Sequence, residues 1–211
     1  MDLSNNTIER ICKIFGHLDA LEKKGVDFVS SRELAEEIGS TEHTIRKDIS
    51  LLGGPGYTRK GYEVRTFKKE LGAKFLLTQK RNACIVGLGR LGTALLDYEN
   101  FQEDGFEIVA GFDCNVNKIE RIRTNIDVFP VGRLAEIVRA RSIELGIIAV
   151  PAEAAQGVVD QLTEAGVKGV LNFSPVKVNV PANIVHLDMD FTNALRFIAA
   201  RFIMKKNNDQ K

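Results

Sequence analysis

A short strand that runs directly into a glycine-rich turn and then a helix constrains this chain more than any other feature. Residues 83–86 have the apolar pattern of a buried strand, and Gly87-Leu88-Gly89-Arg90-Leu91-Gly92 follows without a gap. An apolar helical stretch begins at Thr93. In such a turn the first glycine permits a tight bend, the second lets a pyrophosphate approach the backbone, and the third lets the helix pack closely. The amides and dipole at the helix start also favour an anion, so we expect a dinucleotide-binding parallel sheet of the Rossmann type.

An acidic residue follows at the spacing that this motif requires. Residues 106–112 are predicted to form the second strand, which ends at Asp113, 21 residues after Gly92. A spacing of about 20 residues is typical of the carboxylate that binds the adenine ribose hydroxyls. A carboxylate there would repel a 2′-phosphate, so the sequence favours NAD(H) over NADP(H).

Further strands are predicted at 145–150 and 167–173, with a helix at 158–165 between them. Parallel sheets of this kind bind ligands beyond the carboxyl ends of their strands, so the segments after these strands should form the pocket edges. The residues expected to bind the dinucleotide are Gly87, Leu88, Gly89, Arg90, Leu91, Gly92, Asp113, Val150, Pro151, Asn172, Phe173, Ser174 and Pro175.

The first 80 residues predict a different module. Apolar residues recur at helical spacing over residues 7–21, and Gly25 follows. Ser31 is placed to cap a short helix over 32–38, and Ser40-Thr41 to cap a third helix over 42–52. Two short helices joined by a tight turn that contains glycine form a helix-turn-helix. The sequence at 57–64 then resembles a hairpin with a basic tip, which predicts a winged helix.

The third of these helices has the composition of a DNA-reading helix. Arg46 and Lys47 lie near its start, where residues of a recognition helix reach base edges. Residues 40–80 carry nine Lys and Arg against four Asp and Glu, in a chain whose formal net charge is +1. The residues expected to contact DNA are Ser31, Thr41, His43, Thr44, Arg46, Lys47, Arg59 and Lys60. Three-helix units also serve as dimerisation or peptide-binding modules, so the pattern leaves that alternative open.

The placement of reactive side chains does not favour catalysis. His17 and His43 precede the glycine motif and His186 follows the last predicted strand, so none is placed as a hydride-transfer base. The sequence has no nucleophile elbow or metal-ligand cluster. Its three cysteines are widely spaced, which predicts a reducing compartment without disulfides. With no signal-peptide core and no apolar run near the ~20 residues that span a membrane, we expect a cytoplasmic protein.

An apolar helix is predicted over about residues 190–206. Phe191, Leu195, Ile198 and Phe202 form a stripe at i, i+4, i+7 and i+11. This surface indicates either burial against a partner subunit or docking on the chain's own sheet. The predicted fold class is therefore α/β, with a winged helix-turn-helix domain at 1–78, a Rossmann-like NAD(H)-binding domain at 79–189 and a C-terminal dimerisation helix at 190–211.

With both halves in view, the chain resembles the Rex family of bacterial redox-sensing transcriptional repressors over nearly its full length. Four stretches carry the resemblance: VSSRELA at 29–35, IRKDIS at 45–50, the glycine loop with Asp113, and LNFSPV at 171–176. The resemblance implies a homodimer whose C-terminal helices are exchanged between subunits. It also implies binding of operator DNA in the oxidised state and release of DNA when NADH binds.

The resemblance also implies roles for individual residues. Tyr98 would pair with Asp188 of the partner subunit in one state, and Met189 would lie near the nicotinamide. Arg46 and Lys47 would contact the operator. Some members carry an arginine where this chain has Gly16, so one switch contact is expected to be missing. His43, Thr44 and the 58–62 segment also depart from the family pattern, which implies a different operator sequence rather than a different mode of binding.

Two other functions are compatible with parts of the pattern. The main alternative is an NAD-dependent oxidoreductase with a regulatory N-terminal module, and the absence of a catalytic base weighs against it. The third is a nucleotide-binding module of the CoA-ligase type, whose sheet is similar. Asp113 and the intact glycine loop favour NAD(H) over that ligand.

Overall fold

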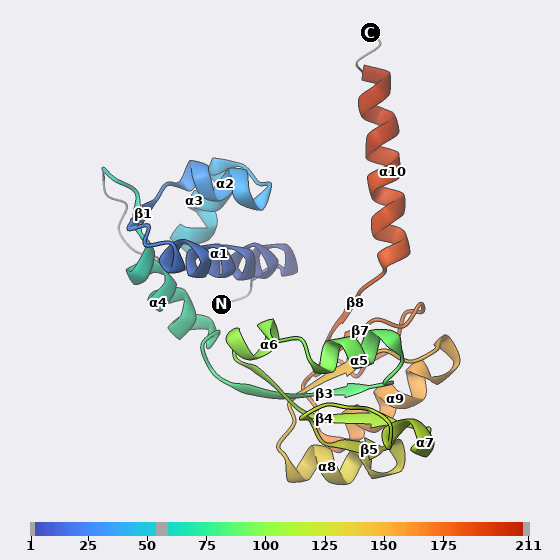
Figure 1. The fold of residues 1–211 in the computed structure, drawn as a ribbon. Helices are drawn as coiled ribbons and strands as arrows, with labels where there is room; N and C mark the ends of the chain where they lie inside the picture. Colours follow the sequence, from blue (N-terminus) through green and yellow to red (C-terminus); the bar gives the residue numbers. More distant parts are fainter. Residues whose placement is uncertain (1–2, 54–58, 209–211) are drawn as a thin grey trace. The chain divides into compact units, whose positions relative to one another are not determined.

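The computed structural model describes residues 3–53 and 59–208, and the chain divides into two compact units, residues 1–79 and 80–211 (Figure 1). Each unit has its own hydrophobic core. The first unit contains α1 (Asn5–Lys23), β1 (Phe28–Val29), α2 (Ser31–Ile38), α3 (Glu42–Leu51), β2 (Tyr62–Glu63) and α4 (Val64–Phe75). The predicted helix-turn-helix is therefore present as α2 and α3, which pack on α1 through Ile11, Leu34 and Ile45.

The caps of α2 and α3 set the geometry of the helix-turn-helix. Ser30, not Ser31, caps α2: its side chain accepts from the Glu33 amide, and the Glu33 carboxylate accepts from the Ser30 amide. The prediction of Ser31 as the cap was therefore wrong by one residue. Gly39 closes α2 in the left-handed region at φ 71°. Thr41 caps α3 as predicted, because its hydroxyl accepts from the Thr44 amide.

The predicted hairpin over 57–64 is only partly in agreement with the structure. Tyr62 and Glu63 form β2, which pairs antiparallel with β1 rather than with a neighbouring strand. Val64, predicted to continue the hairpin, begins α4, where it is buried together with Phe67 and Leu71. This i, i+3, i+7 spacing is helical, and it explains why the strand stops. Residues 57 and 58 of the prediction lie outside the described residues.

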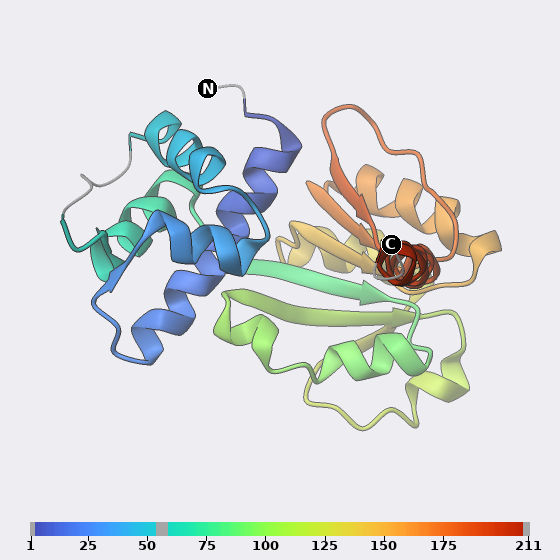
Figure 2. The same cartoon turned by 90° about the horizontal axis from the view of Figure 1, so that it is seen from above.

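The second unit is built on a parallel sheet. Its strands are β3 (Arg81–Val86), β4 (Phe106–Asp113), β5 (Val128–Pro130), β6 (Leu145–Ile148), β7 (Gly169–Asn172) and β8 (Val185–Asp188), in the order β5-β4-β3-β6-β7-β8. Every neighbouring pair is parallel. Figure 2 shows β3 and β4 side by side and running the same way. The strand order reverses direction between β3 and β6, which is where doubly wound sheets bind ligands.

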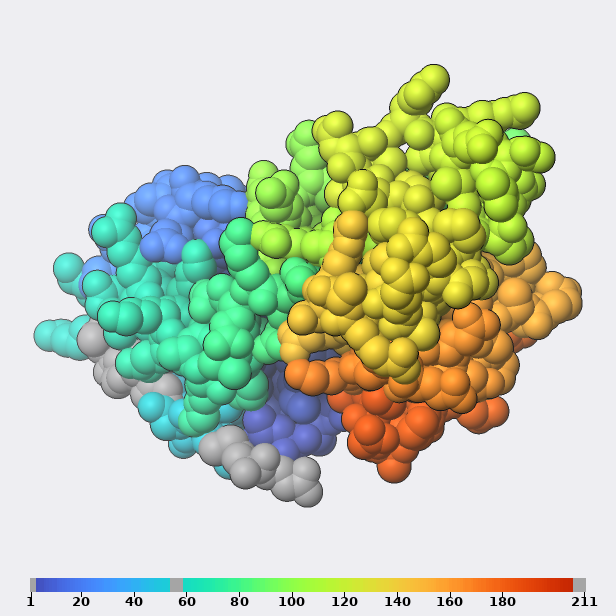
Figure 3. Space-filling model, turned by 90° about the horizontal axis from the view of Figure 1, so that it is seen from below, coloured from blue at the N-terminus to red at the C-terminus, as the bar shows by residue number. Residues whose placement is uncertain are grey.

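Helices cover both faces of this sheet. They are α5 (Arg90–Leu96), α6 (Asn100–Glu103), α7 (Val116–Ile119), the 3₁₀ turn at Val131–Arg133, α8 (Leu134–Ala140) and α9 (Ala152–Ala165). The last helix, α10 (Phe191–Asn208), projects away from the sheet and covers neither face (Figure 1). On one face Val138 of α8 and Leu162 of α9 pack in a single core with Phe112. Figure 3 shows the side chains of α8 as a continuous surface on this side of the unit. On the other face Leu96 of α5 packs with Ile85 and Leu88.

Several predicted boundaries differ from the structure. The first helix of this unit begins at Arg90 rather than Thr93 and ends at Leu96, so Tyr98 lies beyond it. The predicted helix at 158–165 begins earlier, at Ala152. His186 was expected to follow the last strand, but it lies within β8. That strand escaped prediction because it is short and its side chains are largely exposed, so it has no buried apolar pattern.

Candidate functional site

The three glycines of the loop differ in how strictly the fold requires a residue without a side chain. Gly87 has φ 93°, and a Cβ there would lie 2.6 Å from the Ala149 carbonyl oxygen. A Cβ on Gly92 would lie 2.0 Å from the carbonyl oxygen of Gly87. A Cβ on Gly89 would meet nothing within 4 Å. The fold therefore requires Gly87 and Gly92, whereas Gly89 faces open space that a ligand could fill.

A cavity of about 790 Å³ lies at the carboxyl ends of the strands on either side of the order reversal. This volume is within the range of small-molecule and cofactor sites. The predicted cofactor residues on its wall are Gly87, Gly89, Asp113, Val150 and Pro151. The wall also contains residues that were not among those predicted to bind the cofactor, among them Cys114, Asn115, Lys118 and Gln161. Neither their spacing nor their type marks them in the sequence.

Asp113 is nearly buried at the end of β4 and is held from three sides. Its Oδ2 accepts from the Leu88 amide at 2.9 Å and from Lys118 Nζ at 2.6 Å. Its Oδ1 accepts from the Asn115 amide at 2.9 Å. The carboxylate thus ties the glycine loop to the turn after β4, a role that the spacing argument did not predict.

These contacts also determine the ionisation of Asp113. Burial by itself raises the pKa of the carboxyl group, because the charged form is desolvated. The hydrogen bonds from Lys118, Asn115 and Leu88 outweigh burial, and the net pKa lies below its ordinary value of 3.8. Asp113 is therefore an anion whose charge is paired with Lys118 at neutral pH.

Other predicted cofactor residues are not on this wall. The side chain of Leu88 is buried in the core, so only its backbone is available near the loop. Asn172 is fully buried: it donates to the carbonyl of Val176 and to Asp188, and it accepts from the Ser174 amide. Those bonds correct the expectation that the Asn172 side chain forms a pocket edge. Arg90, Leu91, Gly92, Phe173, Ser174, Pro175 and Met189 also lie off the wall of this cavity.

The residues expected to act in switching have partners within the chain. Asn172 Nδ2 lies 2.8 Å from Oδ1 of Asp188, which fixes that carboxylate at the end of β8. The Tyr98 hydroxyl accepts from Asn100 Nδ2 at 3.1 Å, and its ring meets Phe101 edge-on at 5.0 Å. Tyr98 is half exposed, so its ring remains accessible.

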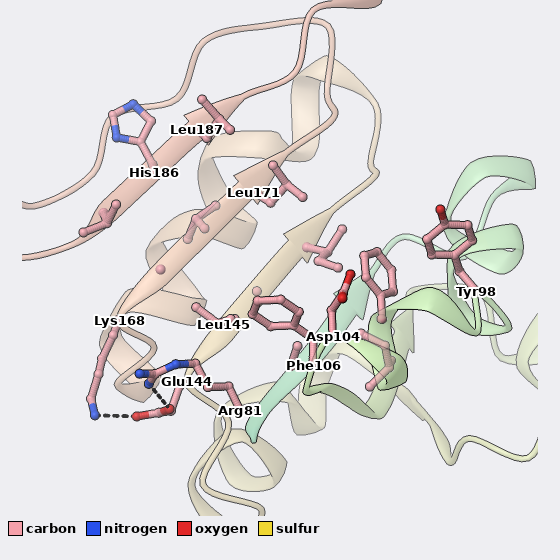
Figure 4. A pocket seen from close by; sticks show the side chains of 18 of the residues that line it. Arg81, Tyr98, Asp104, Phe106, Glu144, Leu145, Lys168, Leu171, His186 and Leu187 are labelled. Carbon is pink, nitrogen blue, oxygen red and sulfur yellow. Dashed lines mark hydrogen bonds and ion pairs between the residues drawn. The ribbon is translucent and has the colours of Figure 1, made fainter. Parts of the chain in front are cut away.

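A second cavity, of about 560 Å³, lies on the sheet face beside α6 (Figure 4). Its floor is apolar and includes Leu145 and Leu171, and Leu187 lies at its edge. At one end Glu144 accepts hydrogen bonds from Arg81 at 2.9 Å and from Lys168 at 2.6 Å. Figure 4 shows Arg81, Glu144 and Lys168 together at one end of the cavity, beside Leu145. The cavity thus offers an apolar surface with a charged end, where two cations share one carboxylate.

Helix α3 holds one of its basic residues in a hydrogen-bonded group. Arg46 Nη2 contacts Glu42 at 2.5 Å, and Arg46 Nε donates to the Ser31 hydroxyl at 3.1 Å. Ser31 in turn donates to Glu42 at 2.9 Å and is fully buried. The expectation that Ser31 contacts DNA is corrected by this burial: its hydroxyl positions Arg46 and Glu42 instead.

Asp48, next to Lys47, anchors α3 to α1. Arg10 donates to it through two nitrogens, at 2.6 and 3.0 Å, and the carboxylate is almost completely buried. Such a two-point pair fixes orientation as well as distance. The sequence analysis placed Asp48 in a family motif but did not predict this partner.

The remaining predicted DNA residues lie on the surface of the first unit. His43, Arg46 and Lys47 are exposed on α3. The hydroxyls of Thr41 and Thr44 lie 2.8 Å apart. Among the basic residues before β2, Arg59 is exposed, and Lys60 Nζ lies 5.4 Å from the centroid of the Phe28 ring.

Within residues 3–53 and 59–208, no group of three or more His, Cys, Asp or Glu side chains is arranged to hold a metal ion. None of the described helices is both long and apolar enough to cross a membrane.

The fold and the two candidate sites define a class of protein: a helix-turn-helix module followed by a dinucleotide-type parallel sheet. Two family models match the same division. One, described as "Putative DNA-binding protein N-terminus", matches residues 2–50, and one described as a CoA binding domain matches residues 78–176.

Relatives over nearly the full length identify the family. The chain is 39% identical over 186 residues to a redox-sensing transcriptional repressor Rex of Carboxydothermus hydrogenoformans, covering 88% of this chain and 89% of the relative. It is 37% identical to a protein of the same name from Desulfitobacterium hafniense, over 87% of this chain and 88% of the relative. The chain belongs to the Rex family of redox-sensing transcriptional repressors. This membership favours the repressor over the oxidoreductase alternative.

Solved structures of the Rex-family repressor RSP are similar throughout. RSP in complex with NADH has a TM-score of 0.87 and 29% identity, covering 100% of this chain and 99% of that one. RSP in complex with NAD⁺ and operator DNA gives the same TM-score and identity, covering 97% of that chain. The α/β fold class with its Rossmann-like sheet is therefore confirmed.

Proposed function

We propose that this protein is a repressor that binds operator DNA through α3 and releases it when NADH binds beside the glycine loop. The observation that carries the proposal is the 790 Å³ cavity walled by Gly87, Gly89 and Asp113, in a chain of the Rex family. The residues present fit a dinucleotide: Gly89 leaves open space at the loop, and Asp113 offers a carboxylate beside it. Bound NADH would supply the redox state that is sensed, and the chain's own residues bind it.

The DNA-binding part of the proposal is supported by the placement of basic residues on α3. Arg46 and Lys47 are exposed in the middle of α3, next to the N-terminal residues with which recognition helices meet base edges. Asp48 is buried on the opposite side and anchors the helix. The helix therefore presents its basic residues outward from a fixed base, and the wider DNA surface includes Thr41, His43, Thr44, Arg59 and Lys60.

Coupling between the two sites follows from linkage. If NADH binds one conformation of the dimer better than the other, operator DNA must weaken NADH binding by the same factor that NADH weakens DNA binding. A neutral reduced nicotinamide enters an apolar pocket at less cost than the cationic oxidised ring. Met189 and Phe173 are the proposed neighbours of that ring, and Tyr98 and Asp188 the proposed switch residues.

The experiment starts by selecting DNA from a random pool, with and without NADH. The selected operator is then titrated with the protein by fluorescence anisotropy in the presence of NADH or NAD⁺. We expect NADH to weaken binding far more than NAD⁺ does. Equal effects of both nucleotides would reject redox sensing, and no selected sequence would reject the repressor.

We further propose that the protein is a homodimer in which the C-terminal helices are exchanged. Every residue of α10 from 191 to 206 is exposed, including the stripe of Phe191, Leu195, Ile198 and Phe202. At 18 residues α10 is about 27 Å long, so it carries far more apolar surface than a monomer usually leaves in water. This surface supports burial of α10 against a second copy of the chain.

The apolar cavity beside α6 is the proposed receiving surface. No helix of the described chain covers β7 and β8 on that side, and Val185 and Leu187 are exposed there. Leu195→Asp and Ile198→Asp would place charges on the stripe. We expect the wild-type mass in sedimentation to be that of a dimer and the double variant to be monomeric. A monomeric wild-type protein would favour docking of α10 on its own sheet.

A further inference from the structure

The contact between Asp113 and Lys118 bears on nucleotide selectivity, which the glycine motif by itself does not determine. Lys118 Nζ lies 2.6 Å from Asp113 Oδ2, and the lysine side chain is 38% exposed on the wall of the same cavity. The pair therefore faces the ligand space with its cation more accessible than its anion.

Hydrogen-bond capacity shows what each member can still offer. A carboxylate has about four acceptor positions, and Asp113 uses three of them on Leu88, Asn115 and Lys118. An ammonium has three N–H donors, and the bond to Asp113 uses one. Lys118 thus has more capacity left for a ligand than Asp113 has.

The charge balance changes the usual explanation of dinucleotide selectivity. A lone carboxylate excludes a 2′-phosphate by repulsion, but here the carboxylate is paired with a cation, so the local charge of the pair is close to zero. Repulsion by Asp113 alone cannot then account for a preference. What prevents Lys118 from attracting a phosphate is its own bond to Asp113.

We propose that the Asp113–Lys118 pair sets the preference for NAD(H), with Lys118 a latent 2′-phosphate site that Asp113 holds in check. In the native pair Lys118 donates to the ribose hydroxyls of the nucleotide while Asp113 keeps it in place. When the carboxylate is removed, the freed ammonium becomes a point charge of the kind that binds phosphate. This inference rests on the proposed NADH site.

The test compares NADH and NADPH binding by nicotinamide fluorescence in the full-length protein and its variants. Asp113→Asn should improve NADPH binding by roughly tenfold or more, since a hydrogen bond to a charged group is worth about that factor. Lys118→Met should weaken NADH several-fold without any gain for NADPH. In Asp113→Asn/Lys118→Met the NADPH gain should disappear.

Controls separate the proposal from general damage. Lys13 makes the same kind of bond, 2.7 Å to Glu9, but it lies on α1 in the first unit, so Lys13→Met should leave both nucleotides unaffected. If Asp113→Asn folds poorly, Asp113→Ala replaces it, and thermal unfolding of each variant reports folding independently. If the double variant binds NADPH as tightly as Asp113→Asn does, the proposed role of Lys118 is wrong. Failure of the wild-type protein to bind NADH would instead reject the proposed function.

Discussion

Two nearly buried aspartates, Asp48 in the first unit and Asp113 in the second, are held in different ways. Asp48 is paired with a guanidinium at two points, and the pair joins two helices within a packed core. Asp113 receives two backbone amides and one ammonium, and it borders a cavity. The first arrangement satisfies the carboxylate with a rigid internal partner. The second keeps it ionised with mostly backbone donors and leaves a partly exposed lysine on the cavity wall.

The difference indicates different roles for two residues of similar burial. A planar, two-point Arg–carboxylate pair fixes the relative orientation of α1 and α3, and hence of the proposed DNA-binding surface. A lysine partner adapts more easily, because its flexible stem can follow a change in its surroundings. Asp48 is therefore expected to matter chiefly for stability, and Asp113 chiefly for ligand binding.

Removal of Asp48 should have the largest effect on stability. Asp48→Ala leaves Arg10 partly buried without its carboxylate, and breaking a buried pair in this way typically costs 3–5 kcal/mol. Because Arg10 is about a quarter exposed, we expect the free energy of unfolding to fall by roughly 3 kcal/mol. Urea unfolding and hydrogen exchange of the α3 amides would measure this loss. The double change Arg10→Met/Asp48→Leu should recover much of the loss. A single variant as stable as the wild type would show that the pair does not anchor α3.

Asp113→Asn should lower the free energy of unfolding of the second unit by a smaller amount, about 1–3 kcal/mol. An amide side chain cannot accept from Leu88 and Asn115 on both sides, so one backbone donor loses its partner. The loss is limited because the residue borders a cavity that admits water. If urea unfolding shows a larger loss for Asp113→Asn than for Asp48→Ala, the division of roles is wrong.

These two aspartates also show which features of the structure can be predicted from the sequence alone. The glycine loop and Asp113 were predictable because the motif is local and its spacing is fixed by one strand-helix-strand unit. The partner of Asp48 was not, because Arg10 lies 38 positions away and only the packing of α1 on α3 brings them together. Lys118 is close in sequence to Asp113, but its side chain reaches the carboxylate only because of the conformation of the turn after β4.

Predictions were wrong where the local sequence was compatible with more than one structure. Ser30 and Ser31 are both good caps, and the capping box with Glu33 decides for Ser30. Val64 fits a strand by its type, but burial with Phe67 and Leu71 makes it the start of a helix. Asn172 was placed correctly at a strand end, while its orientation inward toward Asp188 depended on β8, a strand that the sequence did not reveal.

A pH series gives a further, smaller test of Asp113. Its pKa is lower in the folded protein than its ordinary value of 3.8, so it stabilises the fold above that value. The contribution is lost as the pH falls through the lower, folded-state pKa. The thermal midpoint of the wild type should therefore exceed that of Asp113→Asn near neutral pH, and the two should converge below about pH 3.8. A gap that persists in strong acid would mean that packing, not charge, separates the two proteins.

The smallest effect on stability is expected at the exposed pair of Glu42 and Arg46. Surface pairs at i, i+4 contribute about 0.3–0.5 kcal/mol, and Glu42→Gln keeps an oxygen that can accept from the Ser31 hydroxyl. Because Arg46 is held at Nε and Nη2, the direction of its guanidinium group is restricted. Weakening that hold should broaden the base preference in operator selection while leaving unfolding almost unchanged.

Glu36→Gln is the matched control for this last prediction. It removes a comparable i, i+4 partner, that of Arg32 on α2, where no buried hydroxyl joins the pair. Both variants lose one negative charge, so both should bind non-specific DNA slightly better. Only Glu42→Gln should change which sequence is selected. If the two variants select the same operator as the wild type, Arg46 is oriented by DNA itself and not in advance by Ser31 and Glu42.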